Sequence, residues 1–147
     1  MSPFVALAVL AVLVAFATAL GVLSRVRAGR VRAGGGQRLA PADLGAERFG
    51  EHATLLQFST EFCAPCRATK RLLAALASAR PGVAHVDVDL GRRPDLADRF
   101  RILQTPTTLL LDAGGTVRAR IGGTPRETDL RSTLDAVLED TRADFPR

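Results

Sequence analysis

The chain has 147 residues, enough for one domain with its own hydrophobic core and a short appendage. Hydrophobic residues make up 47% of it, which excludes a chain that is disordered over most of its length. The net charge of +5 comes from residues 1–38, which hold five arginines and no acid, because the other 15 basic residues are matched by 15 acidic ones. Trp and Tyr are absent, so stacking on bases is poorly supported and we expect no nucleic-acid partner.

The first predicted element is an apolar run from Phe4 to Leu23, inside a stretch, residues 1–24, that has no charged side chain. A helix of that length spans about 30 Å, the thickness of a bilayer's hydrocarbon core. The run therefore predicts one transmembrane helix that contacts membrane lipid through residues 4–23. A cleaved signal peptide is the alternative, because Ala17-Thr18-Ala19 is a small-x-small site, although no basic residue precedes Phe4.

Residues 25–40 are rich in Arg, Gly and Ala and have no apolar periodicity, so they predict a linker that acts as a tether. Its arginines suit contact with anionic lipid headgroups. Because they follow the apolar run and none precedes it, the charge bias predicts an N-terminus outside and the rest of the chain in the cytoplasm. An extracytoplasmic domain is the alternative.

Residues 41–147 are predicted to form the globular domain. Strands separated by helices favour parallel pairing through right-handed crossovers, and a final hairpin adds antiparallel strands. The prediction is an α/β domain of three layers with a mixed central sheet. The expected elements are helices at 41–49, 63–79 and 94–101, strands at 53–59, 83–89, 107–111 and 116–121, a hairpin turn at 112–115, and a last helix opened by a capping box at 124–127.

The only two cysteines lie in Cys63-Ala64-Pro65-Cys66, between a predicted strand and a predicted helix. The N-terminus of a helix carries a partial positive charge that stabilises a thiolate, the form of cysteine that attacks disulfides. Cys63 is therefore the predicted nucleophile and Cys66, one turn later, the resolving cysteine. Pro65 fits the first turn, where its missing N–H costs nothing. We expect no cofactor beyond the redox-active disulfide.

Two metal-binding alternatives compete with this interpretation. A zinc site normally has four ligands, and only His52 and His85 are available to join the two cysteines, so no metal is predicted there. A dithiol module that holds a soft ion such as Cu(I) is a non-catalytic alternative. An enzyme would cycle repeatedly between the dithiol and the disulfide, whereas such a carrier would not, and this difference distinguishes the two.

Several segments together resemble the thioredoxin family from about Leu44 to Leu138. They are residues 58–67 around the cysteines, Thr105-Pro106-Thr107, the hairpin turn at 112–115 and Gly122. The resemblance implies a thioredoxin-like fold and disulfide exchange with disulfide- or thiol-containing protein substrates. It also implies a reductase partner that donates the electrons. It also implies a cis bond between Thr105 and Pro106, opposite Cys63, that exposes the backbone of Thr105 to an extended substrate.

The sequence departs from the family at several positions around this pair. Phe62 replaces the usual Trp, and Ala64 the usual Gly. Gln57 stands where the family buries an aspartate and cannot take a proton, and His85 stands where that aspartate has a lysine partner.

These departures mean that reducing power as strong as thioredoxin's is not implied. His85 is then the only nearby group that titrates near neutral pH, with a purely structural role as the simpler interpretation. Thr105 has a hydroxyl where the family has an aliphatic side chain, and we expect it to donate to the Cys63 thiolate. In the cytoplasm the domain is expected to act as a reductant, and outside it to serve as a reductase or oxidase of the cytochrome c maturation kind.

Overall fold

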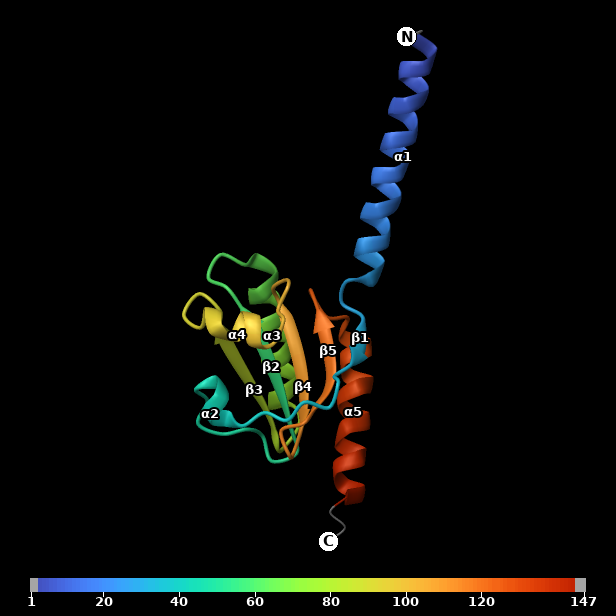
Figure 1. The fold of residues 1–147 in the computed structure, drawn as a ribbon. Helices are drawn as coiled ribbons and strands as arrows, with labels where there is room; N and C mark the ends of the chain where they lie inside the picture. Colours follow the sequence, from blue (N-terminus) through green and yellow to red (C-terminus); the bar gives the residue numbers. More distant parts are fainter. Residues whose placement is uncertain (1–2, 145–147) are drawn as a thin grey trace.

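The computed structural model describes residues 3–144, and every element predicted for the globular domain is present (Figure 1). The helices and strands are α1 (Pro3–Arg27), β1 (Val31–Ala33), α2 (Pro41–Leu44), β2 (Ala53–Ser59), α3 (Ala64–Ser78), β3 (Val83–Asp89), α4 (Pro94–Arg99), β4 (Thr107–Asp112), β5 (Val117–Gly122) and α5 (Glu127–Asp144).

The five strands form one sheet in the order β1-β5-β4-β2-β3. Strands β2 and β3 pair in parallel through α3, and all other neighbours are antiparallel. Helices α3 and α5 pack on one face of the sheet, whereas α2 and α4 cover the other. The predicted three-layer α/β fold with a mixed sheet is thus confirmed.

Strand β2 is buried along its whole length because helices cover both faces of the sheet. Leu56 and Phe58 point into the core beneath α2 and α4, and Leu55 points into the core beneath α3 and α5. Alternation along the strand places Gln57 on the same face as Leu55. The polar side chain of Gln57 therefore lies under α3, where the cysteines are.

Part of the segment 25–40, predicted to be a tether, is held against the sheet. Val31–Ala33 forms β1, which pairs with β5 in the register Val31↔Ile121. Backbone hydrogen bonds continue on both sides of β1, from Gly29 N–H to the Gly122 carbonyl (2.8 Å) and from Leu39 N–H to the Gly115 carbonyl (2.8 Å). The segment is held because β5 has unpaired backbone groups to satisfy, and that attraction needs no apolar pattern.

Several boundaries differ from the prediction by one or more residues, and two of these differences have a clear structural cause. The last helix begins at Glu127, so the capping box expected at 124–127 does not open it. The residues before it are tied to a neighbouring loop, since Gly123 adopts a positive φ of 83° and donates its N–H to the Pro106 carbonyl (2.7 Å). Helix α2 ends at Leu44 rather than near residue 49, because Gly45 takes the left-handed conformation that caps a helix.

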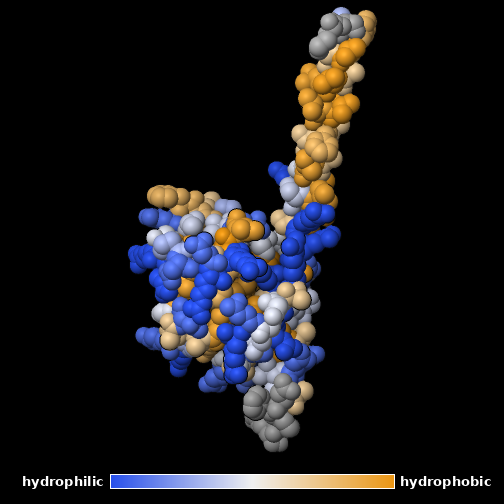
Figure 2. All heavy atoms as spheres, viewed as in Figure 1, coloured by the Kyte–Doolittle hydropathy of each residue, from blue (hydrophilic) through white to orange (hydrophobic). Residues whose placement is uncertain are grey.

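Helix α1 stands clear of the globular domain as an apolar column (Figure 2). Among residues 3–144 it is the one helix long and apolar enough to cross a membrane, and none of that apolar stretch is buried against the protein. It continues to Arg27, past the predicted apolar run, so its last turn carries Arg25 and Arg27. An N-terminal apolar helix of this kind is a candidate membrane anchor or signal sequence.

Candidate active site

The two cysteines form a disulfide at the start of α3 (S–S 2.06 Å). Cys63 is the residue that caps the helix, and its sulfur accepts a hydrogen bond from the Cys66 N–H (3.2 Å). Cys63 is partly exposed, whereas Cys66 is only 3% exposed. The pair therefore has one sulfur that another protein can reach and one that lies beneath it.

The Thr105–Pro106 peptide bond is cis, which confirms the prediction made from the family resemblance. This loop lies against the loop before Cys63, because the Thr105 and Thr60 hydroxyls are 3.4 Å apart. With the disulfide formed, the Thr105 hydroxyl thus contacts that of Thr60, and its hydrogen bond to a Cys63 thiolate stays a prediction for the reduced protein. The Thr107 hydroxyl donates to the Gln104 carbonyl (2.7 Å) and holds the loop from its other end.

Phe62 and Pro65, on either side of Cys63, have clear positions in the structure. Phe62 is 96% exposed, so an apolar ring is presented to solvent immediately before Cys63. Pro65 lies in the first turn of α3, where no N–H is required, as predicted. The exposed ring suits contact with a partner rather than a structural role, because it makes no core contact that would explain its presence.

Gln57 is fully buried, and its side-chain amide donates to the backbone carbonyl of Cys66 (2.9 Å). Its Oε1 atom has no hydrogen-bond partner among the described residues, and neither do the buried hydroxyls of Thr69 on α3 and Thr108 on β4. Gln57 therefore fixes the backbone below the second cysteine but cannot exchange a proton with it.

His85 lies on β3, where it pairs with Leu55 in the sheet, and it does not line the groove beside the cysteines. Burial lowers the pKa of His85, because desolvation disfavours the charged ring, and the nearby Asp87 carboxylate opposes that effect only in part. The ring's Nε2 atom is buried without a partner among residues 3–144. These features support the structural interpretation of His85 rather than a proton-transfer role.

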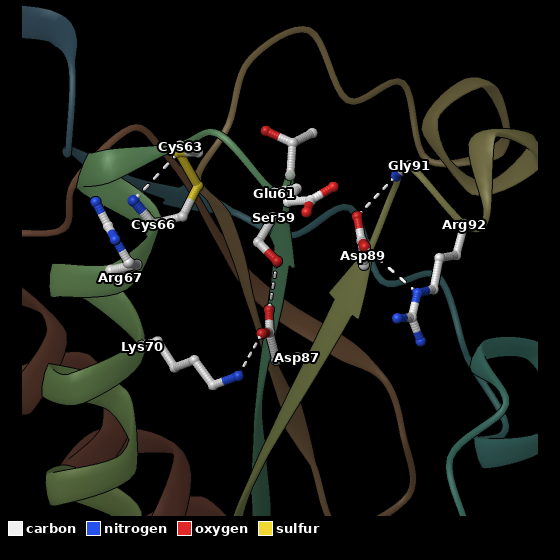
Figure 3. A pocket seen from close by; sticks show the side chains of 11 residues that line it. Ser59, Glu61, Cys63, Cys66, Arg67, Lys70, Asp87, Asp89, Gly91 and Arg92 are labelled. Carbon is white, nitrogen blue, oxygen red and sulfur yellow. Dashed lines mark hydrogen bonds and ion pairs between the residues drawn. A yellow bond between two sulfur atoms is a disulfide. The ribbon is translucent and has the colours of Figure 1, made fainter.

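A groove of about 540 Å³ runs from the disulfide down to β3 (Figure 3). Asp87 projects into it and forms an ion pair with Lys70 of α3 (Nζ–Oδ2 2.9 Å). The Ser59 hydroxyl donates to the other oxygen of the same carboxylate (2.7 Å). Sequence reasoning missed this trio. Its signals were the polar alternation of β3 and the spacing of Lys70, one helical turn after Cys66.

The shifted pKa of His85 predicts how stability depends on pH. The unfolded ring, with an ordinary pKa of 6.5, binds a proton that the buried ring resists. The free energy of unfolding should therefore be greatest above about pH 6.5 and fall as the pH drops from there toward the lower pKa of the folded state. The slope should be smaller in His85→Gln, as measured by urea unfolding of the full chain in detergent micelles between pH 5 and 8. Equal slopes in the wild type and His85→Gln would contradict this assignment.

Comparisons with known proteins agree with this geometry. The family model of thioredoxin matches residues 47–136. The chain is 34% identical over 71 residues to thioredoxin-2 of Pyricularia oryzae, covering 48% of this chain and 42% of that protein. It is 30% identical over 77 residues to thioredoxin of Chlamydia trachomatis, covering 52% of this chain and 76% of that protein. The matched segment thus spans about half the length of some of these relatives and most of others.

A solved structure is similar as well. The X-ray structure of Fasciola hepatica thioredoxin superposes with a TM-score of 0.51 and 28% identity, over 59% of this chain and 82% of that one. A sheet of this topology with a disulfide at the start of α3 and a cis-proline loop beside it defines a thioredoxin-fold redox domain. The chain belongs to the thioredoxin family.

Proposed function

We propose that this protein is a membrane-anchored thiol–disulfide oxidoreductase that reduces disulfides of protein substrates. The observation that carries the proposal is the partly exposed Cys63, disulfide-bonded to the buried Cys66 at a helix N-terminus and next to the cis Thr105–Pro106 loop. A soft-metal carrier would need two thiolates, but it would have no use for a substrate-binding loop beside them.

The reaction proceeds by two exchanges. The Cys63 thiolate attacks one sulfur of the substrate disulfide and releases the other as a thiolate, which leaves a mixed disulfide on Cys63. The Cys66 thiolate then attacks the Cys63 sulfur, releases the second substrate thiolate and forms the disulfide seen here. Two electrons have passed to the substrate, so a reductase partner must return two electrons and two protons before the next cycle.

Substrate recognition follows from the loops around Cys63. An extended segment that pairs with the backbone of Thr105 gains main-chain hydrogen bonds that do not depend on its sequence. The exposed ring of Phe62 adds an apolar contact on the other side of Cys63. Protein substrates with a disulfide in an extended, accessible segment fit this surface.

The membrane anchor places the active site near the bilayer. Strand β1 starts at the end of β5 that holds Gly122, and Gly123 of the same end donates to the Pro106 carbonyl. Helix α1 therefore leaves the domain at the end of the sheet where the cysteines and the cis-proline loop lie (Figure 1). Substrate disulfides close to the membrane surface are the ones that this arrangement serves.

A basic groove of about 300 Å³ lies at the same end, between the chain after α1, the loop before β4, and β5. It has no acidic lining residue, and hydrophilic atoms gather where α1 meets the domain (Figure 2). Such a groove suits anionic headgroups and favours the cytoplasmic side for the domain. Its arginines are Arg27, Arg30, Arg32, Arg101 and Arg120.

Reporter fusions to the C-terminus of the full chain test this orientation. Alkaline phosphatase, which folds only outside the cytoplasm, should be inactive there, and green fluorescent protein should fluoresce. Acid-quenched cells treated with a thiol-alkylating reagent should show Cys63 and Cys66 mostly reduced, because thiols in the cytosol are kept reduced. The opposite reporter result, with an oxidised pair, would place the domain outside and favour a reductase or oxidase of the cytochrome c maturation kind.

A further inference from the structure

We propose that Asp87 is the group that takes the proton from Cys66 when the mixed disulfide is resolved, and that Lys70 and Ser59 position it. The proposal rests on the disulfide exchange described above and names the proton acceptor for its second step. It assigns a role to an ion pair that lies in the same groove as the disulfide.

The second exchange requires such an acceptor. Cys66 enters the mixed disulfide as a thiol, and only its thiolate attacks the Cys63 sulfur. The proton leaves with no change in electron count: it moves to a carboxylate, the new S–S bond forms, and the released substrate thiolate later takes a proton from that acid. Cys66 is only 3% exposed, so direct loss to bulk solvent is hindered. Gln57, which contacts its backbone, has no basic atom.

Three carboxylates line the groove with the cysteines, and they differ in their surroundings. Glu61 is exposed in the loop before α3. Asp89 is the last residue of β3; its carboxylate accepts the Gly91 N–H (2.8 Å) and lies 3.8 Å from the Arg92 guanidinium. Asp87 is the most buried of the β3 pair, with its side chain 21% exposed against 37% for Asp89.

The sheet register places Asp87 next to Gln57, the residue that contacts the backbone of Cys66. Asp87 pairs directly with Gln57 across β2 and β3, on the sheet face that α3 covers, and Gln57 in turn contacts Cys66. The other groups that face Asp87 are Lys70 from α3, Ser59 from β2 and His85 from its own strand. The charged residues Arg67 and Arg92 line the same groove. A groove of about 540 Å³ admits water, and one water is enough to carry a proton between a thiol and a carboxylate.

Contacts with Lys70 and Ser59 make the Asp87 carboxylate suited to accept the proton of Cys66. The ion pair and the hydrogen bond fix both oxygens, so the carboxylate does not turn toward bulk solvent (Figure 3). When Asp87 takes the proton, it becomes neutral, and the charge of Lys70 is left one helical turn from the new Cys66 thiolate. That charge stabilises the thiolate at the moment when it must attack.

Stopped-flow reaction of the full chain, reduced and in detergent micelles, with 5,5′-dithiobis(2-nitrobenzoate) separates the two steps. The first release of thionitrobenzoate reports attack by Cys63, and the second reports resolution by Cys66. In Asp87→Asn the second phase should slow by about 100-fold at pH 6–7 and recover as the pH rises, with the first phase unchanged. Asp87→Glu, which keeps the acid, should retain most of the rate, and Asp89→Asn is the matched control on the same strand.

The outcomes are distinct. An unchanged pH profile of the second phase in Asp87→Asn overturns the proposal, and so does a profile that changes only in His85→Gln. An equal loss of second-phase rate in Asp87→Asn and Asp87→Glu indicates a structural role for Asp87 and also overturns the proposal. Unfolding midpoints of both variants equal to that of the wild type in micelles exclude misfolding as the cause of a slower second phase. If the wild-type chain itself shows no second phase, the proposed disulfide exchange fails, which is a different result from a failed role for Asp87.

Discussion

Cys66→Ser should accumulate stable mixed disulfides between Cys63 and its substrates, whereas Cys63→Ser should accumulate none and lose disulfide reductase activity down to the uncatalysed rate. Cys63 is the partly exposed residue that caps the N-terminus of α3, where the helix dipole acts most strongly on a thiolate. Without Cys66, nothing nearby resolves the intermediate, because the chain has no third cysteine. The effect is complete because each cysteine has a role that no other residue supplies.

Non-reducing gels of membranes from cells that express each variant give the measurement. The Cys66→Ser lane should show bands of higher mass that disappear on addition of a dithiol reductant. Ala64→Gly, a change in the same spacer that keeps both sulfurs, is the control and should turn over insulin as the wild type does. Trapped species in Cys63→Ser instead of Cys66→Ser would reverse the two roles.

The elements with the strongest side-chain patterns were predictable from the sequence. Strand β2 matches its predicted bounds because a run of apolar residues flanked by polar ones is what a strand with both faces covered requires. The start of α3 could be predicted from the positions of the two cysteines and Pro65. The cis bond at Pro106 came from the family resemblance, since an X–Pro bond is cis in only about 5–6% of cases on chemistry alone.

The missed features depend on partners that the local sequence does not reveal. Lys70 and Asp87 meet because the crossover through α3 brings that helix over β3, and neither residue belongs to the motif around the cysteines. Strand β1 is held by backbone hydrogen bonds to β5, so its three residues, one of them Arg32, show no pattern typical of a strand. An edge strand that satisfies a neighbour's backbone is therefore hidden from pattern-based prediction.

Gly34→Val should detach this edge strand. Gly34 follows β1 and donates its N–H to the Arg118 carbonyl (3.0 Å), and a Cβ atom there would collide with the backbone carbonyl of Val117. The carbonyl belongs to β5, which is fixed by β4, so β1 must move instead. We expect a loss of about 1–3 kcal/mol in the free energy of unfolding, the usual cost of overpacking.

Gly35→Asn is the matched control, because Gly35 faces open space and Asn tolerates its left-handed backbone (φ 78°). Hydrogen exchange of the full chain in micelles should show faster exchange at the amides of residues 29–39 in Gly34→Val alone. Unchanged protection there would mean that the segment is held by contacts other than β5.

The functional consequence follows from what β1 connects. With β1 paired, only residues 28–30 separate α1 from the sheet. In the proposed membrane-anchored form, this short connection would hold Cys63 at a fixed height above the bilayer. Once β1 is released, the residues between α1 and α2 become a flexible tether. The domain then takes up a wider range of distances and orientations relative to α1. Gly34→Val should therefore lose activity toward a disulfide engineered next to a transmembrane segment while it keeps activity toward soluble insulin. Equal losses on both substrates would show that β1 serves stability alone.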